Sequence, residues 1–364
     1  MEFQSKNDRK MNTKITFLHL FAILFLLILI FACKNDDDAS DGDLTGIPEF
    51  YVEDELVICP SKIINLSNVS FQINRAYEFE NLIIGGGFND MVIFNPATEN
   101  LIEIDTIGVN QFLEYDGKLM ICAKEGLYSF DSQQNIILET NERCHSVHLS
   151  TNGTFLMTGT DKRILSWNST QGLTPYTDSH LTNFIDMFNL IELNNGELWT
   201  ITGNGKIARF KDQLFFDFYD ADDLPINESV LEVPMFMSAY EEGAILVAKN
   251  GFAYQIFKYT NNQEWVTLFD SVNTPDSDET TAIVLPSITG IIINEDKLYI
   301  STTLASCKGF QVFEISKNEL LSSEDYYPQF DTNFDSHCVH GLAYGSNGDI
   351  FTIADNQVLI YDCN

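Results

Sequence analysis

The chain is short of positive charge. Its 364 residues include 20 Lys and Arg against 53 Asp and Glu, which gives a formal net charge of −33 at pH 7. A field of this sign repels phosphate backbones and anionic lipid, so the shortage excludes nucleic-acid binding. It favours cationic or basic partners, although solubility alone would also account for it.

The motifs of common catalytic and phosphate-binding sites are also missing. The sequence contains no Gly-x-Ser-x-Gly elbow and no Asp-x-Asp-x-Asp-Gly calcium loop. Its one glycine run, Gly85-Gly86-Gly87, lies between two strand-like segments with no helix after it, so it is a turn and not a phosphate cradle. These absences favour a binding module over an enzyme.

Disorder is excluded by what the chain does contain. Hydrophobic residues make up 45% of it, with 28 Phe and 14 Tyr. A chain of this length and composition can bury a large core, as one large all-β domain or two smaller ones.

The N-terminal segment is built like a secretory signal. Basic residues precede an apolar run from Ile15 to Ala32, and the run ends at Cys33. Residues 1–32 are therefore expected to be removed, which leaves 16 basic and 51 acidic residues. The run is also long enough to be a membrane-spanning anchor, so an anchored and a fully secreted form are the alternatives.

Ile30-Phe31-Ala32-Cys33 resembles a bacterial lipobox, and the following CKNDDDASDGD resembles the export tag of surface lipoproteins in Bacteroidetes-type bacteria. The resemblance implies that Cys33 is lipidated and that the protein sits in the outer membrane, facing the extracellular side. The protein would contact the membrane only through this lipid. Residues 33–49 would be an acidic flexible tether, and residues 50–364 a single, monomeric domain.

A repeat organises the chain from about residue 71. Each repeat begins with an apolar segment, a polar turn and a second apolar segment. A break that contains Gly or Asn follows, and then a third segment rich in aromatic residues. The turns fall at Asn81, Gly117, Gly153, Gly196, Gly243, Asp296 and Gly348. Seven β-rich units without helical periodicity between them predict a seven-bladed β-propeller. The period-2 alternation of Leu119, Ile121 and Ala123 predicts half-buried second strands.

The ends of the chain agree with this count. The last unit stops after its third segment, and a spare strand-like segment, Glu55 to Leu66, precedes the first unit. We expect the last blade to be closed by this N-terminal strand, since closure removes an exposed sheet edge. The phrases GLYSFD and ELWTITGNGKIARFK are similar to the propeller repeats of bacterial regulator-type sensor domains, which supports the fold and says little about activity.

Besides Cys33, six cysteines remain, an even number that suggests disulfides in an exported protein. Six cysteines can pair in fifteen ways, and the predicted propeller reduces the number of pairings that are sterically reasonable. Adjacent-blade pairs Cys122–Cys144 and Cys307–Cys338 are expected on one face, with Cys59–Cys363 joining the N-terminal strand to the last strand. The competing hypothesis, thiolate ligation of a metal, needs these thiols to stay reduced.

The histidines gather where blades begin. His145 and His148 start one blade and His337 and His340 another, so His145 and His340 are candidates to face each other across the channel. There they would ligate a divalent metal or act as acid–base groups. The plainer interpretation is that they are loop residues bonded to backbone.

Long acidic connections into the last blades carry the other ligand-binding candidates. Tyr326, Tyr327, Asp331 and Asp335 lie in one of them, and similar acids lie in the segments from Asp220 and Asp270. Carboxylates beside aromatic rings suit sugar recognition, or coordination of Ca²⁺ or another divalent cation. They would also suit a solvated loop.

Three functions follow as hypotheses. The first is a non-catalytic surface module that binds an extracellular glycan or protein. The second is an extracellular metal-assisted lyase or hydrolase that uses His145 and His340. The third is a structural scaffold of an outer-membrane complex.

Overall fold

The computed structural model describes residues 62–66, 68–160, 162–178, 186–219, 223, 232–250, 253–270, 287–303, 310–321, 339–344, 350–354 and 357–361. All of them belong to the compact unit Phe50–Asn364, and the chain's other unit is Met1–Glu49. The segments predicted to be a signal and an acidic tether, and Cys33, therefore lie outside the described residues. Within the described part of the chain, no helix is long and apolar enough to span a lipid bilayer.

Six sheets each contain four consecutive strands that pair antiparallel. The first sheet is β2 (Arg75–Phe79), β3 (Leu82–Gly86), β4 (Asp90–Asn95) and β5 (Asn100–Asp105). The second is β6 (Val109–Tyr115), β7 (Lys118–Ala123), β8 (Gly126–Phe130) and β9 (Ile136–Thr140). The third is β10 (Cys144–Leu149), β11 (Phe155–Gly159), β12 (Leu165–Asn168) and β13 (Gly172–Pro175).

The next three sheets continue the pattern. The fourth is β14 (Met187–Glu192), β15 (Leu198–Thr202), β16 (Ile207–Lys211) and β17 (Leu214–Tyr219). The fifth is β18 (Glu232–Tyr240), β19 (Gly243–Asn250), β20 (Ala253–Tyr259) and β21 (Trp265–Asp270). The sixth is β22 (Ser287–Asn294), β23 (Lys297–Thr303), β24 (Phe310–Glu314) and β25 (Glu319–Leu321).

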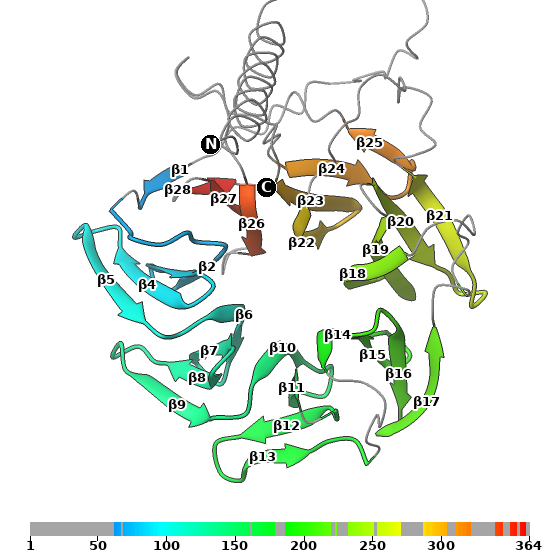
Figure 1. Cartoon of the computed structure of the whole chain (residues 1–364), viewed down its shortest axis with the longest axis horizontal. Coiled ribbons are helices and arrows are strands. Elements are labelled where there is room, and N and C mark those ends of the chain that lie inside the picture. The colour runs from blue at the N-terminus through cyan, green and yellow to red at the C-terminus, as the bar shows by residue number, and fades with distance from the viewer. Residues whose placement is uncertain are drawn as a thin grey trace, which may run out of the picture. The chain divides into compact units, whose positions relative to one another are not determined.

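Figure 1 shows these sheets in chain order around a common centre, with β2, β6, β10, β14, β18 and β22 innermost. The protein is therefore an all-β propeller, and the six sheets are blades. Four further strands are β1 (Lys62–Asn65), β26 (Val339–Tyr344), β27 (Ile350–Ala354) and β28 (Gln357–Tyr361). They pair in the order β1-β28-β27-β26.

The turn between the first and second strands is set by the residues that the repeat places there. Gly117 and Gly153 have φ values of 69° and 82°, in the left-handed region where a side chain is strained. Asn81 has a φ of 65° at the same place in the first blade, since Asn tolerates this conformation better than most residues. The glycines and asparagines of the repeat thus mark real hairpins.

The second strands differ from the half-buried pattern expected for them. All five residues of β3, β11 and β15 are buried, and so are all of β7 except Lys118. The reason is their place in the middle of a blade, because both faces of such a strand pack against neighbouring blades.

The core lies between successive blades. Phe79 and Ile84 of the first blade pack with Leu119, Ile121 and Phe130 of the second. Corresponding clusters join the later blades, and burying each such side chain contributes about 1.5–3 kcal/mol. Stability is thus spread around the propeller, which leaves the ends of the blades available for function.

Adjacent antiparallel strands run in opposite directions, so each first strand begins at the same end of a blade as the hairpin between the second and third strands. We call this end of the blades the start face. It carries the beginnings of β6 and β10 and the hairpin between β7 and β8.

Candidate functional site

A β-bulge recurs near the beginning of the innermost strands. The register shifts at this point in β6, β10, β14, β18, β22 and β26. The residues that the bulges leave unpaired are Asn110, His145, Asn189 with Leu190, Met235, Thr289 and His340. A bulge re-aims a side chain and is common beside functional sites. His145 and His340 thus occupy the same position in their strands.

His145 has an acidic and an aromatic neighbour. Its Nε2 lies 3.4 Å from Oδ1 of Asp186, and its ring centroid lies 4.8 Å from that of Phe188 in β14. Both of these polar atoms are buried, and neither makes a hydrogen bond in the described part of the chain. Burial lowers the pKa of His145, and the attraction of Asp186 does not reverse this. The imidazole is therefore neutral near pH 7.

His148 faces a different carboxylate. Its Nε2 lies 3.6 Å from Oε2 of Glu192, which also accepts the Thr151 N–H at 2.7 Å. Burial lowers the pKa of His148 as well. The two histidines of β10 therefore have separate acidic partners. Among the described residues there is no group of three or more His, Cys, Asp or Glu side chains that could hold a metal ion.

A disulfide fixes this part of the start face. Cys122 of β7 is bonded to Cys144 of β10, with their Cα atoms 5.1 Å apart, and both residues are fully buried. This is the pair predicted from the sequence. The bond joins the second and third blades immediately beside His145.

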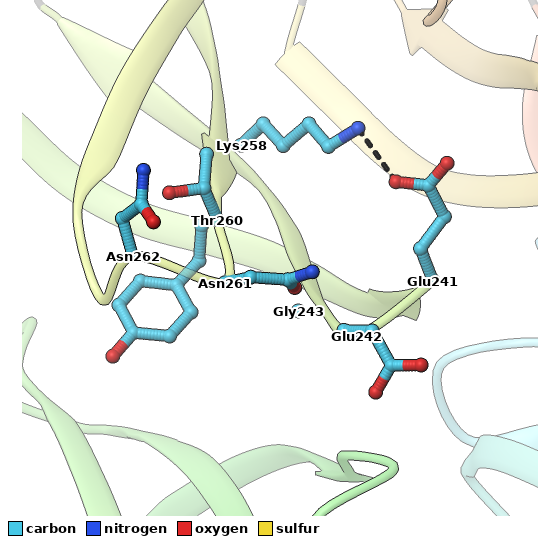
Figure 2. Close-up of a pocket in the computed structure, with 8 residues that line it drawn as sticks. Glu241, Glu242, Gly243, Lys258, Thr260, Asn261 and Asn262 are labelled. Carbon is cyan, nitrogen blue, oxygen red and sulfur yellow. Dashed lines mark hydrogen bonds and ion pairs between the residues drawn. The ribbon is translucent and has the colours of Figure 1, made fainter.

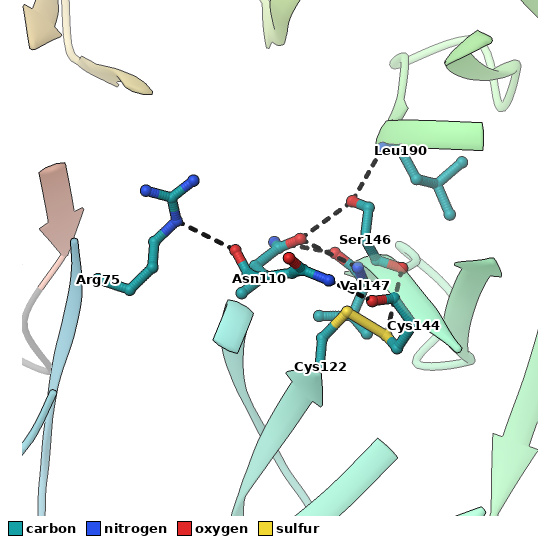
Figure 3. The surroundings of a disulfide bond; sticks show 8 residues. Arg75, Asn110, Cys122, Cys144, Ser146, Val147 and Leu190 are labelled. Atoms are coloured by element: carbon teal, nitrogen blue, oxygen red, sulfur yellow. Dashed lines mark hydrogen bonds between the residues drawn. A yellow bond between two sulfur atoms is a disulfide. The ribbon is translucent and has the colours of Figure 1, made fainter. Parts of the chain in front are cut away.

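Figure 3 shows the hydrogen bonds around this disulfide, which connect three innermost strands. The Asn110 amide donates to the carbonyl of Cys144 at 2.6 Å. Ser146 Oγ donates to Gln111 Oε1 and accepts the N–H of Leu190 in β14, both at 3.0 Å. The beginnings of β6, β10 and β14 are thereby held in fixed relative positions.

Arg75, the first residue of β2, extends this hydrogen-bonded set of strand beginnings to the first blade. Its Nε donates to the carbonyl of Asn110 at 3.1 Å, and its Nη1 donates to the carbonyl of Asn74 at 2.7 Å. Burial lowers the pKa of Arg75. The guanidinium is still charged, because arginine is not deprotonated in proteins.

An exposed aromatic ring belongs to the same face. Phe88 stands in the hairpin between β3 and β4 and is 72% exposed, the largest value among the exposed large hydrophobic residues described. The Nζ of Lys124, from the β7–β8 hairpin, lies 4.6 Å from the centre of its ring. The first two blades thus present a cation and an aromatic surface to solvent.

Two pockets in the described residues lie at the opposite ends of the blades. One, of about 230 Å³, is lined by the β18–β19 and β20–β21 turns, and Figure 2 shows Lys258 paired with Glu241 at its rim, 2.8 Å apart. The other, of about 570 Å³, is lined by residues 114–117 with Leu149 and Gly153. Neither is lined by a predicted site residue, although Gly117, Gly153 and Gly243 of the repeat turns lie in their walls.

Of the predicted site residues, the structure describes His145, His148, Cys122 and Cys144 in full. For His340 only the backbone is described, and it lies in β26. The remaining candidates lie outside the described residues: Cys33, Cys59, Cys307, Cys338, Cys363, His337, Tyr326, Tyr327, Asp331 and Asp335. The expected convergence of His145 and His340 therefore stays a prediction.

Sequence reasoning missed Arg75, Asn110, Asp186 and Phe188. A signal for Asn110 did exist. It is the second residue of its strand, as His145 and His340 are of theirs. Alignment of the strand beginnings would have grouped the three.

No protein-family profile and no curated protein matches the chain. Solved structures do match. Two are structures of the extracellular domain of BT4673 from B. thetaiotaomicron, which one assigns to a one-component and the other to a hybrid two-component system. They match with TM-scores of 0.56 and 0.58, at 15% and 13% identity, over 82% and 83% of this chain.

The match covers 41% and 42% of those two chains, so this chain spans less than half of the extracellular domain that it resembles. A chain of the mitotic checkpoint complex also matches, with a TM-score of 0.53, 9% identity, and coverage of 90% of this chain and 98% of that one. Proteins of such different biology share only the fold at these identities. The chain is a β-propeller similar in fold to the extracellular domain of BT4673.

Proposed function

We propose that this protein is a surface lipoprotein whose propeller binds an extracellular glycan or protein at its start face. The observation that carries the proposal is the set of polar, charged and aromatic side chains held there by bulges and a disulfide. The resemblance in fold to the extracellular domain of BT4673 supports a binding role over a catalytic one.

Binding is tested by screening the purified protein against glycan arrays and against surface extracts in pull-downs. Each screen is run with Ca²⁺ and with a chelator, since the acidic connections suit an oxygen-ligated cation. A saturable ligand supports the proposal. Failure to bind any glycan or protein in both screens would overturn it and leave the scaffold role.

The proposed location rests on the lipobox and the acidic tag. Mass spectrometry of the mature N-terminus should find a lipid on Cys33, and Cys33→Ala should release the protein from the membrane fraction. External protease should degrade the wild-type protein on intact cells. Protection from the protease would contradict an outward orientation.

The blade count is part of the same proposal. We infer seven blades, the last one built from β26, β27, β28 and β1. The antiparallel register of Lys62 to Asn65 with Ile360 to Gln357 supports closure by the N-terminal strand. Contacts of β26 with both β2 and β22 support it as well. Deleting residues 50–66 should then lower the thermal midpoint sharply and promote association through the opened edge.

One observation favours the alternative of a metal-assisted lyase or hydrolase. His145 and His340 share the bulge position, and His145 stands beside Asp186. Turnover of a polysaccharide that is lost in both His145→Asn and His340→Asn would establish this function. Turnover that survives both changes would exclude these histidines.

A further inference from the structure

Arg75 carries a charge that the described protein does not neutralise. Its two hydrogen bonds go to main-chain carbonyls, those of Asn110 and Asn74, and no carboxylate in the described part of the chain lies within ion-pair distance of it. By contrast, Arg209 in β16 is paired with Glu197 at 3.1 Å and with Asp217 at 3.6 Å. The chain has far more acidic than basic residues, so the isolation of Arg75 is not a shortage of carboxylates.

An unpaired charge away from bulk water is costly, because neutral carbonyls replace only part of its hydration. Arg75 retains donor groups beyond the two bonds that orient it, since a guanidinium has five N–H groups. Figure 3 shows the side chain reaching from β2 toward Asn110, with its terminal nitrogens beyond the bonded Nε. The two hydrogen bonds to carbonyls therefore orient the guanidinium and leave its other N–H groups without a partner among the described residues.

The neighbouring hairpin supplies a group that complements Arg75. Oδ1 of Asn74 is buried and makes no hydrogen bond to any described residue, so it adds no ion-pair partner or competing ligand for Arg75. Arg75 is the register partner of Gly86, two residues before the exposed ring of Phe88. A cation and an exposed apolar ring thus belong to the beginning of the first blade.

We propose that Arg75 binds the carboxylate of an acidic saccharide whose apolar C–H face packs on Phe88. The planar guanidinium matches a carboxylate geometrically, and a uronic acid carries a carboxylate, hydroxyls and an apolar C–H face that suits Phe88. This inference rests on the proposed binding function and adds the class of its ligand. A peptide carboxylate shares the charge but lacks the apolar C–H face of a sugar ring.

Calorimetric titration of the full-length protein in detergent tests this inference. The probes are an oligogalacturonate, its fully methyl-esterified form, and a short peptide with a free C-terminal carboxylate. The wild-type protein should bind the acid oligomer at least about tenfold more tightly than the ester, because hydrogen bonds to charged groups are worth about that factor or more. Arg75→Gln should lose at least about tenfold for the acid and change the ester little.

Lys118→Gln is the matched control, because it removes one positive charge at the opposite end of the second blade. It should leave binding of the acid oligomer unchanged. The comparison of acid with ester on the wild-type protein needs no variant, so it decides the question even if Arg75→Gln misfolds.

The outcomes separate this inference from the broader function. Equal binding of acid and ester, or an Arg75→Gln variant that binds like the wild type, overturns the role of Arg75 and leaves a binding module standing. Preference for the peptide overturns the saccharide class. No binding of these probes, with a neutral glycan or protein found in the broader screens, overturns the acidic ligand alone.

Discussion

The side-chain amide of Gln111 pairs with the backbone of Val147 as a neighbouring strand would. Its Nε2 donates to the Val147 carbonyl and its Oε1 accepts the Val147 N–H, each at 3.0 Å. Gln111 belongs to β6 and Val147 to β10, so one side chain joins the innermost strands of two blades. Asn189 in β14 accepts the N–H of Met237 in β18 in a related way.

Replacing Gln111 with Leu should therefore destabilise the protein. The change removes both bonds and the hydrogen bond that Ser146 Oγ donates to the same amide. The N–H and carbonyl of Val147 lose these partners, and the total cost is about 2–3 kcal/mol. Urea unfolding followed by tryptophan fluorescence measures it. Gln133→Leu, in an exposed turn, is the control and should change stability by less than about 0.5 kcal/mol. Equal effects of the two variants would show that the strand-like pairing contributes nothing.

Removing the disulfide should cost more than removing the amide. The bond between Cys122 and Cys144 closes a loop with a sequence separation of 22, and the double change to Ser should lower the free energy of unfolding by about 3 kcal/mol. A reducing agent should destabilise the wild-type protein more than the variant, because only the wild-type protein has this bond to lose. Non-reducing peptide mapping that links Cys144 to any cysteine other than Cys122 would refute the assignment.

The neutral state of His145 predicts a pH dependence of stability. Burial holds its pKa below the ordinary value of about 6.5 for histidine, so the unfolded chain binds a proton more readily than the folded one. The contribution of the neutral imidazole is present above about pH 6.5 and is lost as the pH falls. His145→Asn should therefore flatten the decline in unfolding free energy between pH 7 and pH 5. An unchanged slope, or one that rises toward acid, would contradict it.

Glu197 should show its effect at lower pH. Burial alone would raise its pKa, but hydrogen bonds from Trp199 at 3.0 Å and Arg209 at 3.1 Å outweigh it and lower the pKa. Its stabilisation is present above the ordinary pKa of about 4.3 and fades as the pH falls through the lower folded value. Glu197→Gln should cost about 2 kcal/mol or more at pH 7 and less near pH 3.

Arg209 explains why this site is sensitive. Its guanidinium lies over the rings of Trp199, Phe216 and Tyr219, at 5.2, 4.5 and 4.4 Å from their centres.

Glu99→Gln, in an exposed turn, is the control for the lost carboxylate of Glu197. If both variants respond alike to pH, the ion pair of Glu197 is not the source of the effect.

The repeat made the propeller predictable, because each blade needs strands of alternating or continuous apolar residues and turns of glycine or asparagine. The same local chemistry placed Cys122 and Cys144 on one face. The burial of β3 and β11 on both faces was not predictable from the alternation of apolar and polar residues alone. It depends on the side chains that the neighbouring blades pack against each face.

The candidate site divides in the same way. The sequence by itself determined the β-strands, their turns, the excess of negative charge and the gathering of histidines where blades begin, since these follow from residue type and spacing. Only the tertiary structure decided that Asn110 and His145 stand at bulges and that Asp186 faces His145. It also decided that the partners of Arg75 among the described residues are carbonyls and not carboxylates. Those facts depend on strand register and on contacts between distant residues, such as Arg75 with Asn110, 35 positions apart, which no local pattern encodes.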